Sequence, residues 1–210
     1  RDLHLSIRRQ RQMCIRDSSY TLAAGQSIEN MWISTSGAFN LTGNEFGQVL
    51  WGNGDNNTLD GRGGADTMFG LNGNDTFFVD DVGDQTYENS GQGFDTVRAS
   101  LSYALLAFSE IEVLAVAGGS GTSFAIDLTG NSYGQTIYGN AAGNTIDGQG
   151  GVDHLYGYDG DDVYIVDMAG DRAYETATGG YDTLFASVSY VLQAGQYVES
   201  LGVAMHVWTA

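Results

Sequence analysis

Turn-forming residues and single apolar residues alternate along this chain with a period of nine. Each nonapeptide opens with Gly and carries an apolar side chain at its eighth position. Six residues rich in Gly, Asn and Asp favour a turn, because Gly adopts positive φ freely and Asn and Asp tolerate it. The next three residues favour a short strand whose middle side chain points to one face. The middle residues, which we expect to be buried, are Leu50, Leu59, Met68, Phe77, Ile137, Ile146, Leu155 and Tyr164.

The nonapeptides belong to a longer repeat of 87 residues, because the segment 41–53 recurs as 128–140 and the correspondence continues without a gap. We predict repeat unit 1 at 41–127 and repeat unit 2, cut short, at 128–210. Residues 19–40 match the tail of such a unit. The sequence therefore indicates part of a longer array of neighbouring repeats.

Residues 1–18 differ from the rest of the chain in composition. They hold five of the eight Arg residues and the single Cys, Cys14. The letters MCIRD at 13–17 resemble the translation of a sequencing adapter, so we interpret 1–18 as a non-native leader and exclude it from the fold. A basic targeting segment is the alternative, although no apolar stretch of a signal peptide is present.

The nine-residue pattern predicts an all-β fold. Two nonapeptides close one coil with position eight inward from both sides, and successive coils stack as parallel strands about 4.8 Å apart. This is a parallel β-roll, or β-solenoid. The spacers between the groups also favour strands, at TVRASLSYAL, TLFASVSYVL and 110–118, with a short helix at 104–109 as an alternative.

Stacking brings position-six residues together every 18 residues. Asp66 then faces Asp84, and Asp75 faces Asn57; in unit 2, Asp153 faces Asp171, and Asp162 faces Asn144. Two carboxylates about 5 Å apart repel by roughly 3 kcal/mol at an effective dielectric constant of 20. Carboxylates and turn carbonyls form an oxygen-only ligand set, which selects Ca²⁺ over Zn²⁺.

The stretches GRGGADTMF, GLNGNDTFF, GQGGVDHLY and GYDGDDVYI resemble the RTX, or haemolysin-type, calcium-binding nonapeptide. The resemblance implies a right-handed parallel β-roll with several Ca²⁺ ions in its turns, and export by a type I secretion route. The implied metal-site residues are Asp66, Asp75, Asp84, Asp153, Asp162, Asp171, Asn57, Asn144, Gly61, Gly63, Gly64, Gly70, Gly73, Gly148, Gly150, Gly151, Gly157 and Gly160.

Four turns depart from the family pattern. Those at 43–48 and 130–135 have Gln at position six, and those at 52–57 and 139–144 have Asn. We expect these turns to bind Ca²⁺ weakly or not at all.

Three acids beyond the nonapeptides recur in both units. Asp80, Glu88 and Asp95 return as Asp167, Glu175 and Asp182. They either complete the last Ca²⁺ site of each unit or cap turns by accepting backbone N–H groups. The sequence leaves both interpretations open.

The acidic composition of the chain argues against several classes of function. The chain of 210 residues has 26 acids, 8 Arg and no Lys, for a net charge of −18. This balance argues against nucleic-acid binding and against docking on anionic lipid, and no apolar run is long enough to span a membrane. Acid pairs that repeat every nine residues differ from the singular constellation of an active site.

We therefore predict a non-enzymatic, calcium-binding structural module of a secreted bacterial protein that folds on meeting Ca²⁺ outside the cell. One alternative is an adhesion or carbohydrate-binding array that uses aromatic ladders at position nine, formed by Trp51 and Phe69 and by Tyr138 and Tyr156. The more common outcome for such rings is cover by the chain's own spacer at 101–108. A second alternative is the secretion module of an enzyme whose catalytic domain lies elsewhere.

Overall fold

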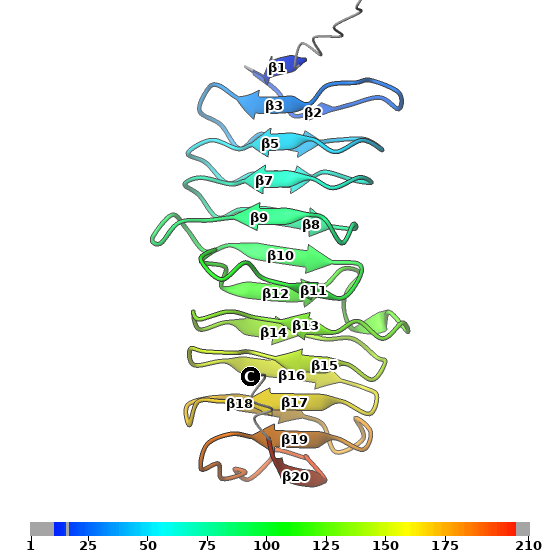
Figure 1. The fold of residues 1–210 in the computed structure, drawn as a ribbon, viewed down its shortest axis with the longest axis vertical. Helices are drawn as coiled ribbons and strands as arrows, with labels where there is room; N and C mark the ends of the chain where they lie inside the picture. The colour runs from blue at the N-terminus through cyan, green and yellow to red at the C-terminus, as the bar shows by residue number, and fades with distance from the viewer. Residues whose placement is uncertain (1–10, 16, 205–210) are drawn as a thin grey trace, which may run out of the picture.

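The computed structural model describes residues 11–15 and 17–204 as a single stack of coils (Figure 1). Apart from one 3-10 turn, η1 (Gly119–Gly121), the regular elements of these residues are strands. The prediction of an all-β solenoid is confirmed. No helix in the described part of the chain is long and apolar enough to cross a membrane.

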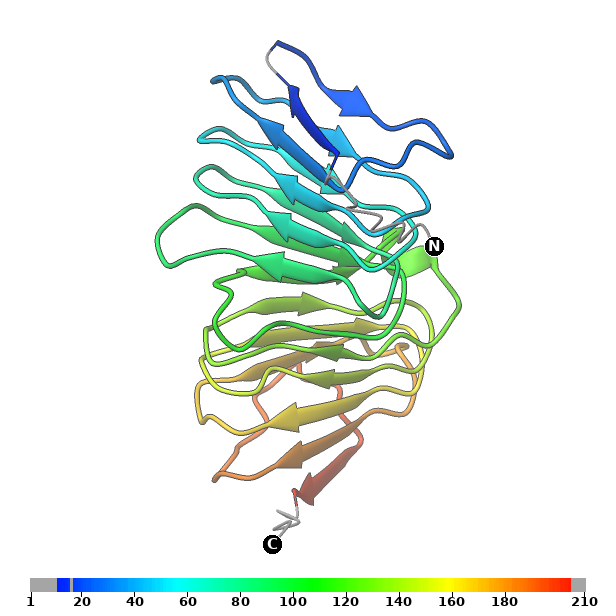
Figure 2. The same ribbon diagram turned by 45° about the horizontal axis from the view of Figure 1, so that its top comes forward.

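The even-numbered strands up to β18 form one parallel sheet of nine, here called the even sheet. Its members are β2 (Tyr20–Thr21), β4 (Leu41–Thr42), β6 (Thr58–Asp60), β8 (Thr76–Val79), β10 (Thr96–Ala99), β12 (Val113–Val116), β14 (Thr136–Tyr138), β16 (His154–Tyr158) and β18 (Arg172–Glu175). The coils follow one another as successive rungs (Figure 2).

The remaining strands form two further parallel sheets. The first contains β1 (Gln12–Ile15), β3 (Asn30–Ile33), β5 (Val49–Trp51), β7 (Thr67–Phe69) and β9 (Gln85–Tyr87). The second contains β11 (Tyr103–Ala104), β13 (Leu128–Thr129), β15 (Thr145–Asp147), β17 (Val163–Val166), β19 (Thr183–Ala186) and β20 (Ser200–Val203).

The strand register confirms that two nonapeptides make one coil. Leu50 lies opposite Met68, and Leu59 lies opposite Phe77, so equivalent residues are 18 positions apart. All eight position-eight side chains are fully buried. They form a continuous apolar core between the two sides of the roll. Burial of one such side chain stabilises the fold by about 1.5–3 kcal/mol.

Repeat unit 1 contains an odd number of strands, the nine from β4 to β12. From β2 to β19 consecutive strands alternate between the two sides of the roll, so an odd number moves the equivalent strands of unit 2 to the opposite side. Trp51 lies on β5, outside the even sheet, whereas its equivalent Tyr138 lies on β14, inside it. Sequence-equivalent surfaces of the two units therefore face opposite directions.

The aromatic ladders at position nine are present on both sides. Trp51 and Phe69 stack with ring centroids 3.8 Å apart, and Tyr138 and Tyr156 stack at 5.0 Å. Tyr87 continues the first ladder beyond Phe69, with ring centroids 4.8 Å apart. From the spacer predicted to cover this ladder, Phe108 contacts Tyr87, with ring centroids 5.8 Å apart. The spacer residues Tyr103 and Leu105 point into the core instead.

The helix alternative at 104–109 is wrong. Residues 103–105 alternate between buried and exposed, as a strand does. The Leu105 N–H donates to the Thr129 carbonyl of the next coil at 2.9 Å. Pairing with the neighbouring coil thus overrides the local preference of Ala and Leu for a helix.

The segment 1–18, interpreted as a non-native leader, lies partly within the described residues. Residues 12–15 form β1, which pairs in parallel with β3, and Ile15 is buried. Residues 1–10 and 16 lie outside the described residues. The assignment of this segment as a leader stays a prediction.

Candidate metal centre

Each position-six Asp carboxylate is tied to the coil before it. Its Oδ1 accepts a hydrogen bond from a backbone N–H exactly one coil earlier: Gln48 to Asp66, Asn57 to Asp75, Gln135 to Asp153 and Asn144 to Asp162, each at 2.6 Å. The ladders continue from Asp66 to Asp84 at 2.9 Å and from Asp153 to Asp171 at 3.1 Å. The structure thus places as neighbours the pairs that the 18-residue spacing predicted.

The second oxygen of these carboxylates has no hydrogen-bond partner among the described residues. This holds for Oδ2 of Asp66, Asp75, Asp153 and Asp162, all of which are buried. Buried polar atoms are nearly always hydrogen-bonded, and an unpaired one costs several kcal/mol. Four recurring orphan oxygens at the same repeat position indicate that each is meant for a ligand the protein chain does not supply.

Glycine is required at two positions of each Asp turn. At position one the backbone lies directly against the carboxylate, so a side chain at Gly61 or Gly148 would collide with the Asp Oδ2 of its own turn. At position four, Gly73 has φ +119 and Gly160 has φ +110, and a Cβ there would meet the backbone of the coil before. Gly70 and Gly157 share the first role, and Gly64 and Gly151 the second. Gly63 and Gly150 have room for a Cβ.

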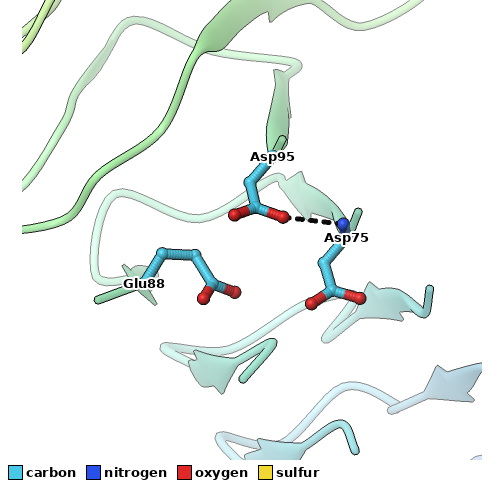
Figure 3. Close-up of side chains that lie close together, drawn as sticks. All are labelled: Asp75, Glu88 and Asp95. Atoms are coloured by element: carbon cyan, nitrogen blue, oxygen red, sulfur yellow. Dashed lines mark hydrogen bonds between the residues drawn. The ribbon is translucent and has the colours of Figure 1, made fainter. Parts of the chain in front are cut away.

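Three buried carboxylates meet at the end of the nonapeptides in unit 1 (Figure 3). Asp75 directly precedes β8, Glu88 directly follows β9, and Asp95 directly precedes β10. One oxygen from each lies within 4.8 Å of the other two. Asp95 Oδ1 also accepts the Asp75 N–H at 2.7 Å. We call this group the unit 1 trio.

The same group recurs in unit 2 as Asp162, Glu175 and Asp182, the unit 2 trio, with the same 4.8 Å limit. The sequence offered Glu88, Asp95 and their counterparts either as ligands or as turn caps. Both descriptions apply to Asp95 and Asp182, because one oxygen of each accepts a backbone N–H and the carboxylate still faces the trio.

Asp80 does not join the unit 1 trio. It lies beside Asp66 and Asp84, and the Asp80 N–H donates to Asp84 Oδ2 at 3.0 Å. Both neighbouring carboxylates raise the pKa of Asp66 further, after burial has raised it. In unit 2, Asp153 likewise lies beside Asp171 and Asp167. Each unit therefore has a second acidic group at the other edge of the roll.

Burial raises the pKa of the carboxyl groups in both trios. In unit 1 the pKa of Glu88 rises to about 9, that of Asp95 to about 7 and that of Asp75 to about 6. For Glu88 the charges of Asp95 and Asp75 add to the desolvation. In unit 2 burial raises the pKa of Asp162 to about 8 and that of Glu175 to about 7. Three ionised carboxylates this close are stable only with a cation among them.

The Gln and Asn turns have a side-chain amide at the position where the Asp turns have a buried carboxylate. The Asn57 side-chain N–H donates to the Phe39 carbonyl of the coil before at 2.7 Å, and the Asn144 side-chain N–H donates to the Ile126 carbonyl at 2.9 Å. At position two, Asn53 and Asn131 bridge to two carbonyls each. A carboxylate has no hydrogen to donate, so an Asp turn lacks this bridge.

We expect Asn57→Asp to destabilise the calcium-free protein by about 2–3 kcal/mol, because it removes a buried donor and adds a buried charge. Thermal unfolding in chelator measures the effect. Asn56→Asp is the matched control, since Asn56 is exposed and its Oδ1 already accepts the Asn74 N–H, which a carboxylate can also accept. Equal stability of the two variants would contradict the role of the amide.

The two trios differ in one neighbouring side chain. The Tyr164 hydroxyl donates to Glu175 Oε1, whereas the equivalent Phe77 has no hydroxyl, and both oxygens of Glu88 are without a partner among the described residues. Glu175 is thus partly satisfied before any ion binds.

Replacing Tyr164 by Phe is expected to destabilise the calcium-free protein by about 1.5–3 kcal/mol, the usual contribution of a hydrogen bond to a charged group. The reciprocal Phe77→Tyr should have the opposite sign. Calorimetric melts with and without Ca²⁺ report both. If Tyr164→Phe left the calcium-free melting temperature unchanged, the hydroxyl would not support Glu175.

The donor set of both trios consists of carboxylate oxygens, with no His or Cys in either group. Hard divalent cations prefer such ligands, and the irregular arrangement suits Ca²⁺ better than Mg²⁺, which demands octahedral geometry. The residues present therefore fit calcium. A cation here would neutralise the buried charges and draw neighbouring coils together.

A comparison with protein families agrees with this chemistry. The family model of the RTX calcium-binding nonapeptide repeat (4 copies) matches residues 42–77 and again residues 129–164. Both matches end before Glu88 and Glu175, so the model does not include the complete trios. No curated protein matches the chain.

Proposed function

We propose that this chain, which contains RTX calcium-binding repeats and is thereby a calcium-binding repeat module, stays incompletely folded at low Ca²⁺ and completes its roll on binding several Ca²⁺ ions outside the cell. The bound ions act structurally. They occupy the Asp turns and the two trios and hold successive coils together.

The observation that carries this proposal is the set of buried carboxylate oxygens without partners. In unit 1 they include Oδ2 of Asp75 and both oxygens of Glu88, and in unit 2 they include Oδ2 of Asp162 and of Asp182. An ion that binds only the folded form stabilises that form by mass action, by about 2.7 kcal/mol per site at 100 times the dissociation constant. Several such sites determine whether the roll forms.

The extracellular part of the proposal rests on the family and on the affinity expected of its sites. Calcium sites of extracellular modules have dissociation constants of about 10⁻⁴–10⁻³ M. Sites of this strength stay empty in a cytosol and fill outside. The RTX repeats are typical of secreted bacterial proteins, and we propose a type I export route and an extracellular or cell-surface location on that ground.

A circular-dichroism titration tests the function. Added millimolar Ca²⁺ is expected to increase the β signal and to raise the melting temperature, and Mg²⁺ at the same concentration is expected to do much less. An unchanged spectrum would contradict calcium-driven folding. A midpoint far below 10⁻⁴ M would contradict an extracellular role specifically.

The aromatic ladders give less support to an adhesion or carbohydrate-binding array. Rings stacked at 3.8 Å and nearly parallel, as in Trp51 and Phe69, cover one another's faces and leave mainly edges for a sugar. An enzyme is also not favoured, because the acidic clusters occur twice at equivalent places, as structural repeats do.

A further inference from the structure

A small hollow lies on the outer face of the even sheet where unit 1 meets unit 2. Its volume is about 240 Å³. Arg98 of β10 and Ala115 of β12 come from unit 1, and Tyr138 of β14 and Tyr158 of β16 come from unit 2. Gly119 of η1 completes the rim. We call this feature the Arg98 hollow.

The hollow is a gap in a column of side chains. Arg98 lies opposite Ala115 in the strand register, and Ala115 lies opposite Tyr138. Beyond it the column continues as a stack of rings, with Tyr138 and Tyr156 at 5.0 Å and Tyr156 and Tyr174 at 4.5 Å. Because neighbouring strands are about 4.8 Å apart, the small Ala115 leaves the space of one flat ring between Tyr138 and Arg98.

The Arg98 side chain makes no hydrogen bond and no ion pair within residues 11–15 and 17–204, and it is exposed. In a chain with 26 acids and 8 Arg, none of the residues that line the hollow is acidic. The hydroxyl-bearing Thr96 and two tyrosines are the other polar side chains of the lining. A guanidinium without a side-chain partner therefore faces a hollow that no acidic side chain lines.

We propose that the Arg98 hollow binds a small aromatic carboxylate. The guanidinium fork matches a carboxylate with two parallel hydrogen bonds. The ring of the ligand then takes the vacant place over Ala115 and continues the tyrosine stack at Tyr138. A hollow of about 240 Å³ has room for a single ring.

The hollow belongs to the junction and not to the repeat. At the positions equivalent to Arg98 and Ala115, unit 2 has Phe185 and Gly202, and the Phe185 ring packs over Gly202. A phenyl ring therefore occupies in unit 2 the region that is open in unit 1. The repeat itself shows that Phe is compatible with the strand at the position of Arg98.

Isothermal titration of the calcium-loaded protein with benzoate tests the proposal. Benzoate is expected to bind with an affinity in the millimolar range, typical of so small a ligand. Benzamide, which lacks the charge, and cyclohexanecarboxylate, which lacks the aromatic ring, should each bind at least about tenfold more weakly.

Substitutions at two positions remove the proposed contacts separately. Arg98→Phe copies the residue of unit 2 and should reduce benzoate affinity about tenfold or more, as should Arg98→Gln. Ala115→Phe should fill the gap and abolish binding. Arg62→Gln removes an equal charge from an exposed turn outside the hollow and should change nothing.

Three results would overturn the proposal: no benzoate binding to the folded protein, equal binding by benzoate and cyclohexanecarboxylate, or unchanged binding in both Arg98→Phe and Ala115→Phe. The Ca²⁺ response of each variant, measured in the same samples, reports that the roll is intact.

Discussion

Replacing Glu88 by Gln is expected to make the calcium-free protein more stable, by about 3 kcal/mol at neutral pH. Both oxygens of the Glu88 carboxylate are buried without a partner among the described residues, and burial together with Asp95 and Asp75 raises its pKa to about 9. Keeping a carboxyl group protonated at pH 7, against its ordinary value near 4.5, costs about 3 kcal/mol. An amide removes this cost and can donate to the two remaining carboxylates.

The same substitution should remove the calcium response of the unit 1 trio. In saturating Ca²⁺ the wild type gains stability from this site and the variant does not. The stability advantage of the variant over the wild type is therefore expected to disappear or to change sign. Chemical denaturation in chelator and in Ca²⁺ measures both quantities. Glu110→Gln, on the half-buried neighbour just outside the trio, is the control and should stay within about 0.5 kcal/mol. A Glu88→Gln protein that is less stable in chelator would show that Glu88 is satisfied without an ion.

The calcium-free protein is expected to lose stability as pH rises. Burial raises the pKa of Asp75 to about 6, that of Asp66 to about 8 and that of Glu88 to about 9 in the folded chain. The folded form thus keeps protons that the unfolded chain releases near its ordinary pKa values of about 4. The stability these groups contribute is complete in acid and is lost progressively as pH increases from about 4 to about 9.

Calcium should reverse this trend, because the ion binds ionised carboxylates and competes with protons. The gain in melting temperature on adding Ca²⁺ is therefore expected to grow with pH, and in acid it should vanish. Melting curves across this pH range, in chelator and in Ca²⁺, give both slopes. A melting temperature that rises with pH in chelator would contradict the burial of these groups as acids without partners.

The periodic part of the fold could be predicted from the sequence because each nonapeptide repeats one local solution. Leu50 and Met68 occupy the same place in successive coils, so a column of apolar residues in the sequence becomes a column of buried residues in space. The contact of Asp66 with the next coil follows from the same spacing. Where turns and strands recur without an insertion, residues 18 positions apart in the sequence become neighbours in successive coils.

The trios could be predicted only in part, because their members leave the nine-residue register. Asp95 lies 20 residues after Asp75, not 18, and Glu88 belongs to the other strand of the coil. Only the recurrence of these acids in unit 2 pointed to them. Their convergence depends on how the loop between β9 and β10 closes, and no local pattern specifies this. The course of 104–109 likewise depended on pairing with β13, a partner more than 20 residues away.

Because a repeat unit contains an odd number of strands, one unit is related to the next by a half-turn about the axis of the roll and a shift along it, as in a two-fold screw. Asp75 lies at a turn that enters the even sheet, whereas Asp162 lies at a turn that enters the opposite sheet, so the two trios occupy opposite edges of the roll. Ions that bind along one edge only would shorten that edge and bend the stack. With the trios on alternate edges, the contractions oppose each other, and we expect the roll to stiffen on binding calcium while its axis stays straight.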